Sequence, residues 1–225
     1  MATRSRLVAT RVPKSPDGVV LVLHGGASRD GDTAVSPTQL SVLRMIPIAS
    51  RIARSGRRRL AVFRLLNSSR GWDTSRTPVD DVTWALGEVR QRFGTDLPVA
   101  LVGHSLGGRA ALLAAVNPEV RSVVALNPWV YPADGGTPMR DRRILIVHGT
   151  ADHIANPESS AAVARGLARH SEVGYVRVIG GKHAMLRRHS VFDRLAADFV
   201  AATLLDRAVN GVVGGVLRGE SPVDI

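Results

Sequence analysis

Short apolar segments alternate with longer segments of helical periodicity along this chain, and this alternation constrains its fold more than any other feature. The short segments span residues 7–12, 19–23, 60–65, 99–102, 123–126, 144–147 and 175–179. Most are apolar throughout, as strands buried on both faces are, and the first is expected at an edge. Helical patterns cover residues 47–55, 78–93, 106–116, 158–168 and 191–205. The alternation predicts an α/β fold with a mostly parallel sheet of about seven strands and helices on both faces.

The length of 225 residues suits one domain with one sizeable core, and no polar linker divides the chain. We therefore expect a single domain over residues 1–225, with its core at about 19–205. Residues 206–225 are apolar but interrupted by glycines, and they fit either a surface-packed tail or a disordered one. Between the later strands the one insertion covers residues 131–137, which leaves no room for a lid domain.

Several classes of protein are excluded by composition. The chain has no cysteine, which excludes a disulfide framework, a thiolate nucleophile and a cysteine-ligated metal site. No apolar run approaches the length of a membrane span. Residues 1–11 carry arginines but no apolar signal region, so we expect a cytoplasmic protein with no membrane partner.

The net charge of +11 raises the question of a nucleic-acid or other anionic partner. Of the 30 basic residues only Lys14 and Lys182 are lysines, and the arginines are spread along the chain. Two clusters, at residues 57–59 and 140–143, immediately precede predicted strands and so lie at the amino-terminal edge of the sheet, whereas active sites of such folds lie at the carboxyl edge. No aromatic residues interleave with these arginines, so we expect a solvated surface and no specific nucleic-acid partner.

A serine with the setting of a nucleophile follows the predicted strand at 99–102. The pentapeptide at residues 103–107 reads Gly-His-Ser-Leu-Gly, a G-x-S-x-G pattern, and an alanine-rich helical stretch follows it. A sharp strand-to-helix turn strains the backbone of Ser105 and exposes its hydroxyl, while side chains at Gly103 or Gly107 would collide with neighbouring backbone. This context predicts a nucleophile elbow rather than an ordinary glycine-rich turn.

A base and an acid for this serine follow two later strands. Serine is a weak nucleophile until a histidine removes its proton, and that histidine needs a carboxylate to hold its tautomer. Asp152 follows the strand at 144–147, and His183 follows the strand at 175–179. Parallel strands bring their carboxyl ends to one edge of the sheet, so we expect Ser105, Asp152 and His183 to meet there.

Other assignments of the base and the acid are weaker. His189 could replace His183, but it lies at the start of the last helical pattern, and Asp134 could replace Asp152 as an acid placed after the preceding strand. Asn127, at the end of that strand, has no carboxylate. The paired spacing of a catalytic metal site is absent, so we expect no metal. Three further histidines lie in strand-end turns and are expected to have structural roles: His24, His104 and His148.

The chain order Ser105, Asp152, His183 resembles the order of the catalytic residues in the α/β-hydrolase family. The resemblance covers roughly residues 19–205. The sequence His-Gly-Gly-Ala at residues 24–27 is similar to the family's HG-containing loop, which supplies a backbone amide to the oxyanion hole. The resemblance implies an α/β-hydrolase fold, a small and nearly lidless esterase-like or dienelactone-hydrolase-like member, and no cofactor. Its oxyanion hole would use the amides of Gly26 and Leu106, with Ala27 as the alternative to Gly26.

The predicted activity is hydrolysis of a small carboxylic ester through an acyl-enzyme. A serine at position 105 excludes the mechanisms in which other members of the family use an aspartate or a cysteine as the nucleophile. Thioesterase, amidase or peptidase, and acyltransferase activities remain open because fold does not choose among them. A non-catalytic scaffold that binds anions through its arginines is the alternative from another class. The sequence does not determine the acyl group or the oligomeric state. Candidate substrate-binding residues follow strands at the active edge: Ala27, Arg70, Trp72, Trp129 and Tyr131.

Overall fold

The computed structural model describes residues 4–26, 34–70, 76–137 and 139–225. Its eight strands are β1 (Arg6–Arg11), β2 (Gly18–Leu23), β3 (Leu60–Leu66), β4 (Val99–His104), β5 (Val120–Leu126), β6 (Arg143–Gly149), β7 (Glu172–Val178) and β8 (Val223–Asp224). Its helices are α1 (Leu40–Leu43), α2 (Met45–Ser55), α3 (Thr77–Phe93), α4 (Leu106–Ala114), α5 (Pro157–Leu167), α6 (His189–Leu205), α7 (Gly211–Leu217) and the 3-10 helix η1 (Pro132–Gly136).

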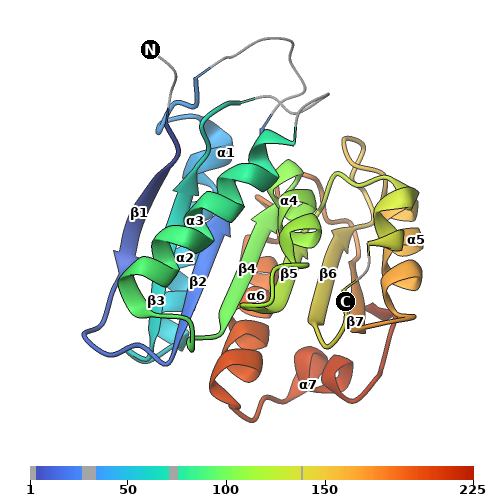
Figure 1. Ribbon diagram of the computed structural model, residues 1–225. Helices are drawn as coiled ribbons and strands as arrows, with labels where there is room; N and C mark the ends of the chain where they lie inside the picture. Colours follow the sequence, from blue (N-terminus) through green and yellow to red (C-terminus); the bar gives the residue numbers. More distant parts are fainter. Residues whose placement is uncertain (1–3, 27–33, 71–75, 138) are drawn as a thin grey trace.

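All strands belong to one sheet, in the order β1-β3-β2-β4-β5-β6-β7-β8 (Figure 1). The pairs from β3 through β8 are parallel, and β1 pairs antiparallel with β3 at the edge. The chain crosses from β2 to β3 on one side and then returns to β4 on the other. This reversal places a topological switch point between β2 and β4, where ligand sites form in open α/β sheets.

Two apolar cores cover the two faces of the sheet, because successive strand residues point in opposite directions. Along β2, Val19, Leu21 and Leu23 belong to the core shared with α3, α4 and α5. Val20 and Val22 belong to the core shared with α2, α6 and α7. Figure 1 shows α3 and α4 on one face of the sheet and α2 and α6 on the other. The predicted α/β fold with helices on both faces is therefore confirmed.

The structure adds one strand to the seven that the sequence predicted. Residues 206–225, which the sequence left unassigned, contain α7 and the short strand β8. On β7, Gly174 makes room for α7, since a Cβ on it would lie 2.0 Å from Val216 Cγ1. Beside β7, the Ile225 amide donates to the Arg177 carbonyl at 3.0 Å. A strand of two residues is too short to show an alternation of apolar and polar residues, so β8 is recognised only by its pairing with β7.

Both arginine clusters lie where the sequence placed them, at the amino-terminal ends of β3 and β6, with Arg143 as the first residue of β6. Several of their members have partners within the chain. Arg59 pairs with Asp17, and Arg143 lies 3.2 Å from Glu172. Arg142 donates to the carbonyl of Ala115 at 3.1 Å, beyond the end of α4. These arginines therefore contribute to local structure as well as to surface charge.

Every helix in the described part of the chain falls short of the length and apolar character that a bilayer span needs.

Candidate active site

The carboxyl ends of β2, β4, β6 and β7 meet at one edge of the sheet, and the predicted functional residues lie there. Ser105 follows β4 directly, and Gly25 and Gly26 follow β2. Asp152 lies in the loop after β6, and His183 lies in the loop after β7. The parallel strands thus bring together residues as far apart in sequence as Gly25 and His183, which are 158 positions apart.

Ser105 occupies a strained turn between β4 and α4. Its backbone has φ 56° and ψ −123°, a region that a residue with a side chain rarely adopts. Gly103 and Gly107 make the turn possible, because a Cβ on Gly103 would lie 2.1 Å from the Gly107 carbonyl oxygen. A Cβ on Gly107 would lie 2.5 Å from the His24 carbonyl oxygen. This is the elbow geometry that the sequence predicted.

The serine, histidine and aspartate form a continuous chain of hydrogen bonds. Ser105 Oγ lies 3.0 Å from His183 Nε2, so the hydroxyl can donate to an unprotonated Nε2. On the other side of the ring, His183 Nδ1 lies 2.8 Å from Asp152 Oδ2 and donates to it. A hydroxyl can thus pass its proton to an imidazole whose orientation and tautomer the carboxylate holds.

The Asp152 carboxylate is enclosed, and donors surround both of its oxygens. Its Oδ1 accepts from the amides of Ile154 at 2.8 Å and Ala155 at 2.9 Å. Its Oδ2 lies 3.3 Å from His148 Nε2 and 2.8 Å from His183 Nδ1. Burial by itself raises the pKa of Asp152, but the hydrogen bonds from the two histidines and Ala155 outweigh burial and hold the pKa below its usual range. Asp152 therefore stays ionised at neutral pH.

The three histidines expected to be structural are buried and bonded within the fold. His24 Nδ1 donates to the Gly25 carbonyl at 2.6 Å, and burial lowers its pKa. His104 Nε2 donates to the His183 carbonyl at 2.9 Å. Burial, with the nearby His183 ring, lowers the pKa of His104 to about 3 and keeps it neutral. His148 contacts Ser160 Oγ at 2.8 Å and, unexpectedly from sequence, the same carboxylate as His183.

Asn127, which the sequence excluded as an acid, braces the two loops that carry Asp152 and His183. It follows β5, and its φ of 41° is one that asparagine tolerates. Its side-chain amide donates to the carbonyls of Lys182 and His183, each at 3.0 Å. Its side-chain oxygen accepts from the Gly149 amide at 2.8 Å. One side chain thereby ties the ends of β5, β6 and β7 together.

The alternative acid and base lie elsewhere. Asp134 forms a two-point ion pair with Arg109, at 2.7 and 3.0 Å, and also accepts from the Tyr131 amide at 2.9 Å. These bonds join η1 to α4. His189 is exposed, at the start of α6, with Asp193 3.8 Å away. Neither Asp134 nor His189 is among the hydrogen-bond partners of Ser105 or His183 in the described residues.

A pocket of about 460 Å³ opens directly over Ser105 and His183. Gly25, Gly26 and His104 line it at the sheet edge. Six residues that the sequence analysis did not name form the rest of its wall: Leu40, Ser41, Leu43, Arg44, Ala184 and Leu186. The three leucines are exposed, and Leu40 is 85% so. The apolar pair at positions 40 and 43, one helical turn apart, was the sequence signal for α1 and for this wall.

The predicted substrate-binding residues do not gather around this pocket. Arg70 is half-buried, and its backbone approaches Gly26, where an added Cβ would lie 2.3 Å from the Arg70 carbonyl oxygen. Trp129 packs against the core, and Tyr131 lies beneath the Arg109 guanidinium, 4.6 Å from it. Among the described residues that line the pocket, none of these three appears. Ala27 and Trp72 lie outside the described residues.

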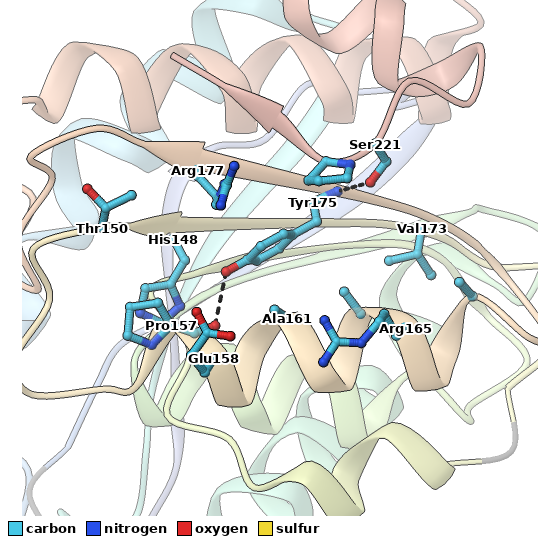
Figure 2. A pocket seen from close by; sticks show the side chains of 13 residues that line it. His148, Thr150, Pro157, Glu158, Ala161, Arg165, Val173, Tyr175, Arg177 and Ser221 are labelled. Carbon is cyan, nitrogen blue, oxygen red and sulfur yellow. Dashed lines mark hydrogen bonds between the residues drawn. The ribbon is translucent and has the colours of Figure 1, made fainter.

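A second, larger pocket of about 740 Å³ lies between α5, β7 and the chain near Ser221 (Figure 2). Tyr175 crosses it and donates its hydroxyl to the Pro157 carbonyl at 3.0 Å. Burial, with the nearby Glu158 charge, raises the pKa of this phenol to about 12. Neither Ser105 nor His183 lines this pocket, so its size does not connect it with the serine.

No cluster of three or more histidine, aspartate or glutamate side chains suited to a metal ion occurs among residues 4–26, 34–70, 76–137 and 139–225.

Solved structures with this architecture include several hydrolases, each of low sequence identity. A Butyrivibrio proteoclasticus protein, Est1E, solved with ferulic acid, is 15% identical with a TM-score of 0.65, over 89% of this chain and 96% of that one. A truncated carbohydrate esterase from gut microbiota is 13% identical with a TM-score of 0.69, over 89% and 90%. An α/β serine hydrolase homologue from Coxiella burnetii is 18% identical with a TM-score of 0.64, over 86% and 90%.

A comparison with curated protein sequences finds no match. The model of the family described as "alpha/beta hydrolase fold" matches residues 18–140, more than half of the chain. This stretch runs from β2 through the Ser105 elbow to the residues after η1. With its sheet order and strand-end loops, the chain belongs to the α/β-hydrolase fold family.

Proposed function

We propose that this protein is a serine hydrolase that cleaves a carboxylic ester through an acyl-enzyme. The observation that carries the proposal is the hydrogen-bonded chain from Ser105 Oγ through His183 to Asp152, with separations of 3.0 and 2.8 Å. Activated serines have this arrangement in unrelated folds, where it performs acyl transfer. The esterases among the structural neighbours share the fold and are consistent with this chemistry.

In the first step, Ser105 Oγ attacks the ester carbonyl carbon while its proton moves to His183 Nε2. Asp152 stays ionised and stabilises the resulting imidazolium through Nδ1. As the tetrahedral intermediate collapses, the bond to the alcohol oxygen breaks and the alcohol leaves with the proton from Nε2. Water then attacks the acyl-enzyme with His183 as base, which releases the acid and restores the serine hydroxyl.

The amides of Gly26 and Leu106 are the proposed donors to the oxyanion. Leu106 begins the nine-residue helix α4, whose positive end favours negative charge beside Ser105. Gly26 adjoins it, because a Cβ on Gly26 would lie 3.4 Å from Leu106 Cδ1. Donors that are already oriented stabilise the developing charge by about 3 to 4 kcal/mol each.

Labelling with a fluorophosphonate probe tests the nucleophile. We expect the probe to attach to Ser105, and Ser105→Ala to abolish both labelling and the turnover of p-nitrophenyl esters. A second serine in the same pocket, Ser41, provides the matched control, and Ser41→Ala should keep both. Labelling elsewhere, or turnover that survives in Ser105→Ala, would refute the proposal.

A substrate panel tests the class of bond. A p-nitrophenyl ester series of graded acyl length is compared with a thioester and an anilide of the same acyl group. Ester hydrolysis predicts the highest kcat/KM for an ester. A higher value for the thioester or the anilide would reassign the same serine chemistry to a thioesterase or an amidase.

A further inference from the structure

Three leucines that line the pocket over Ser105 are open to solvent. Leu40 is 85% exposed, Leu43 40% and Leu186 70%. All three line the same pocket of about 460 Å³ as the serine and its base. Apolar surface in contact with water raises the free energy, and most leucines of this chain lie buried in the two cores. These three leucines therefore form an apolar wall beside the reacting serine, and a ligand can reach it.

Buried neighbours hold these leucines in their exposed positions. Leu40 and Leu43 lie at the two ends of α1, one helical turn apart, and Val42 between them is buried. Leu186 follows Met185, which is buried in the core shared with α2 and α6. Each segment thus anchors one apolar side chain in the protein and leaves its leucines outside. The exposure is a feature of the packed chain rather than of a loose loop.

The polar side chains of this wall are engaged within the protein. Arg44 Nη2 donates to Asp193 Oδ1 at 2.9 Å, and the Arg44 side chain is 8% exposed. Ser41 Oγ accepts from Gln39 Nε2 at 2.9 Å, and His104 is buried. Apart from the reacting pair, a ligand meets mainly leucine, alanine and glycine in this lining. A substrate group that carries charge or several hydroxyls would lose hydration here with few partners in return.

The shape of the preferred group follows from what the wall lacks. Among the described residues that line the pocket there is no phenylalanine, tyrosine or tryptophan. Aromatic faces favour planar rings through stacking, whereas leucine side chains provide apolar contact that a flexible alkyl chain can follow. The larger pocket of Figure 2 differs, because the charged side chains of Glu158, Arg165 and Arg177 line it. The wall over Ser105 thus suits an uncharged alkyl chain.

We propose that the pocket over Ser105 binds an unbranched alkyl chain of the ester against Leu40, Leu43 and Leu186, so that the substrates are esters of medium-length fatty acids or fatty alcohols. The proposal names the substrate class of the serine hydrolase proposed above and rests on that function. Each methylene group that leaves water for this wall adds a similar increment of free energy. Selectivity therefore grows with chain length until the chain extends beyond the leucines.

Two chain-length series test this inference, with every ester kept below the concentration at which it aggregates. p-Nitrophenyl esters from acetate to hexanoate vary the acyl chain, and acetates from ethyl to hexyl vary the alcohol. Each kcat/KM is divided by the rate of alkaline hydrolysis of the same ester, which removes its intrinsic reactivity. We expect one series to rise by about two- to fourfold for each methylene, where the upper value is that of full burial. A terminal carboxylate on the longest chain, or a benzoyl group in its place, should lose most of this gain.

The double variant Leu40→Ser/Leu186→Ser replaces two leucines of the wall with polar side chains. Both leucines are strongly exposed, so the substitutions leave the two cores intact. We expect the ratio of kcat/KM between the longest and the shortest ester to fall by about tenfold. The matched control is Val116→Ser, an apolar residue that is 49% exposed beyond the end of α4 remote from Ser105, and it should keep the wild-type ratio. Because each ratio is taken within one protein, a loss common to all esters cancels.

Binding measurements separate this inference from the proposed function. Calorimetry of the Ser105→Ala variant with the same intact esters measures the dependence of the dissociation constant on chain length without any turnover. Flat series on both sides of the ester, a ratio that survives in Leu40→Ser/Leu186→Ser, or a preference for benzoate over hexanoate would each overturn the assignment and leave the serine chemistry standing. If no ester is hydrolysed but binding to Ser105→Ala still depends on the two leucines, the function fails while the site stands.

Discussion

Asn127 holds His183 by its backbone and not by its ring. The Asn127 side-chain amide lies 3.0 Å from the His183 carbonyl oxygen, while the His183 imidazole is engaged by Ser105 and Asp152. The same side chain accepts from the Gly149 amide on the strand that leads to Asp152. The separation of the His183 ring from the Asp152 carboxylate thus depends on a third residue, whose side-chain hydrogen bonds in the described part of the chain go to backbone groups only.

Asn127→Asp should lower kcat/KM by about tenfold to a hundredfold, because displacing a reacting group by about 1 Å has such an effect. The substitution removes the amide donor and places an oxygen against two carbonyl groups. Asn117→Asp, in the turn after α4, is the control and should leave kinetics unchanged. Steady-state kinetics on folded protein measure the effect. A new carboxylate here should not rescue Asp152→Asn, and such a rescue would contradict a positioning role.

Asp152→Asn should reduce kcat by on the order of ten-thousand-fold, because the amide favours the wrong tautomer of His183. Asp134→Asn tests the alternative acid. It should weaken the pairing with Arg109 and lower the free energy of unfolding by about 1 to 3 kcal/mol, with kcat close to that of the wild type. Turnover and urea unfolding of both variants give the comparison. A large fall in kcat for Asp134→Asn alone would exchange the two roles.

Gly107→Ala should destabilise the protein by about 3 kcal/mol, since its Cβ would lie 2.5 Å from the His24 carbonyl oxygen and 2.6 Å from that of Leu23. Backbone atoms cannot yield as a flexible side chain can. Gly87→Ala on α3 is the matched control, because its Cβ would meet nothing within 4 Å. It should stabilise the protein by about 0.5 to 1 kcal/mol. Equal effects of the two substitutions in urea unfolding would contradict this packing.

His104 should make stability depend on pH. The unfolded chain binds its proton below about pH 6.5, whereas the folded chain binds it only below about pH 3. The contribution of neutral His104 is therefore complete above pH 6.5 and is lost as the pH falls toward 3.

The wild-type protein should lose about 2 kcal/mol of its free energy of unfolding between pH 7 and pH 5 because of His104. The variant His104→Gln, which has no imidazole at this position, should not show this loss. Glutamine keeps a donor for the His183 carbonyl. Urea unfolding at both pH values measures the difference. The exposed His170→Gln should follow the wild-type curve, and a His104→Gln curve parallel to the wild type would rule out the burial of a neutral imidazole.

The elements of the fold were largely predictable because each one buries a face with a regular period. The segments at 60–65 and 144–147 are apolar throughout, and the structure places β3 and β6 there. By contrast, β8 has two residues, and α7 contains three glycines, so neither shows a period. Both elements are held in place by contacts with β7, and these contacts cannot be predicted from the local sequence.

Among carboxylates at strand ends, the sequence favoured Asp152 as the partner of His183 but did not predict the partner of Asp134. Asp134 and Asp152 both follow strands at the active edge, yet one pairs with Arg109 and the other with His183. Which partner each carboxylate meets depends on the packing of η1 against α5 and of α4 against β4. A strand-end position limits where a carboxylate lies, but not which cation or imidazole faces it.

The sequence by itself determined the sheet, the edge at which the chemistry gathers and the order Ser105, Asp152, His183, because parallel strands deliver their following loops to one edge. Only the tertiary structure brought Arg44 beside Ser105 and paired it with Asp193, 149 positions away. That pairing depends on α2 packing against α6, and no periodicity encodes such a distant contact. The pocket over Ser105 therefore depends on helix packing, whereas the meeting of Ser105, Asp152 and His183 follows from strand order.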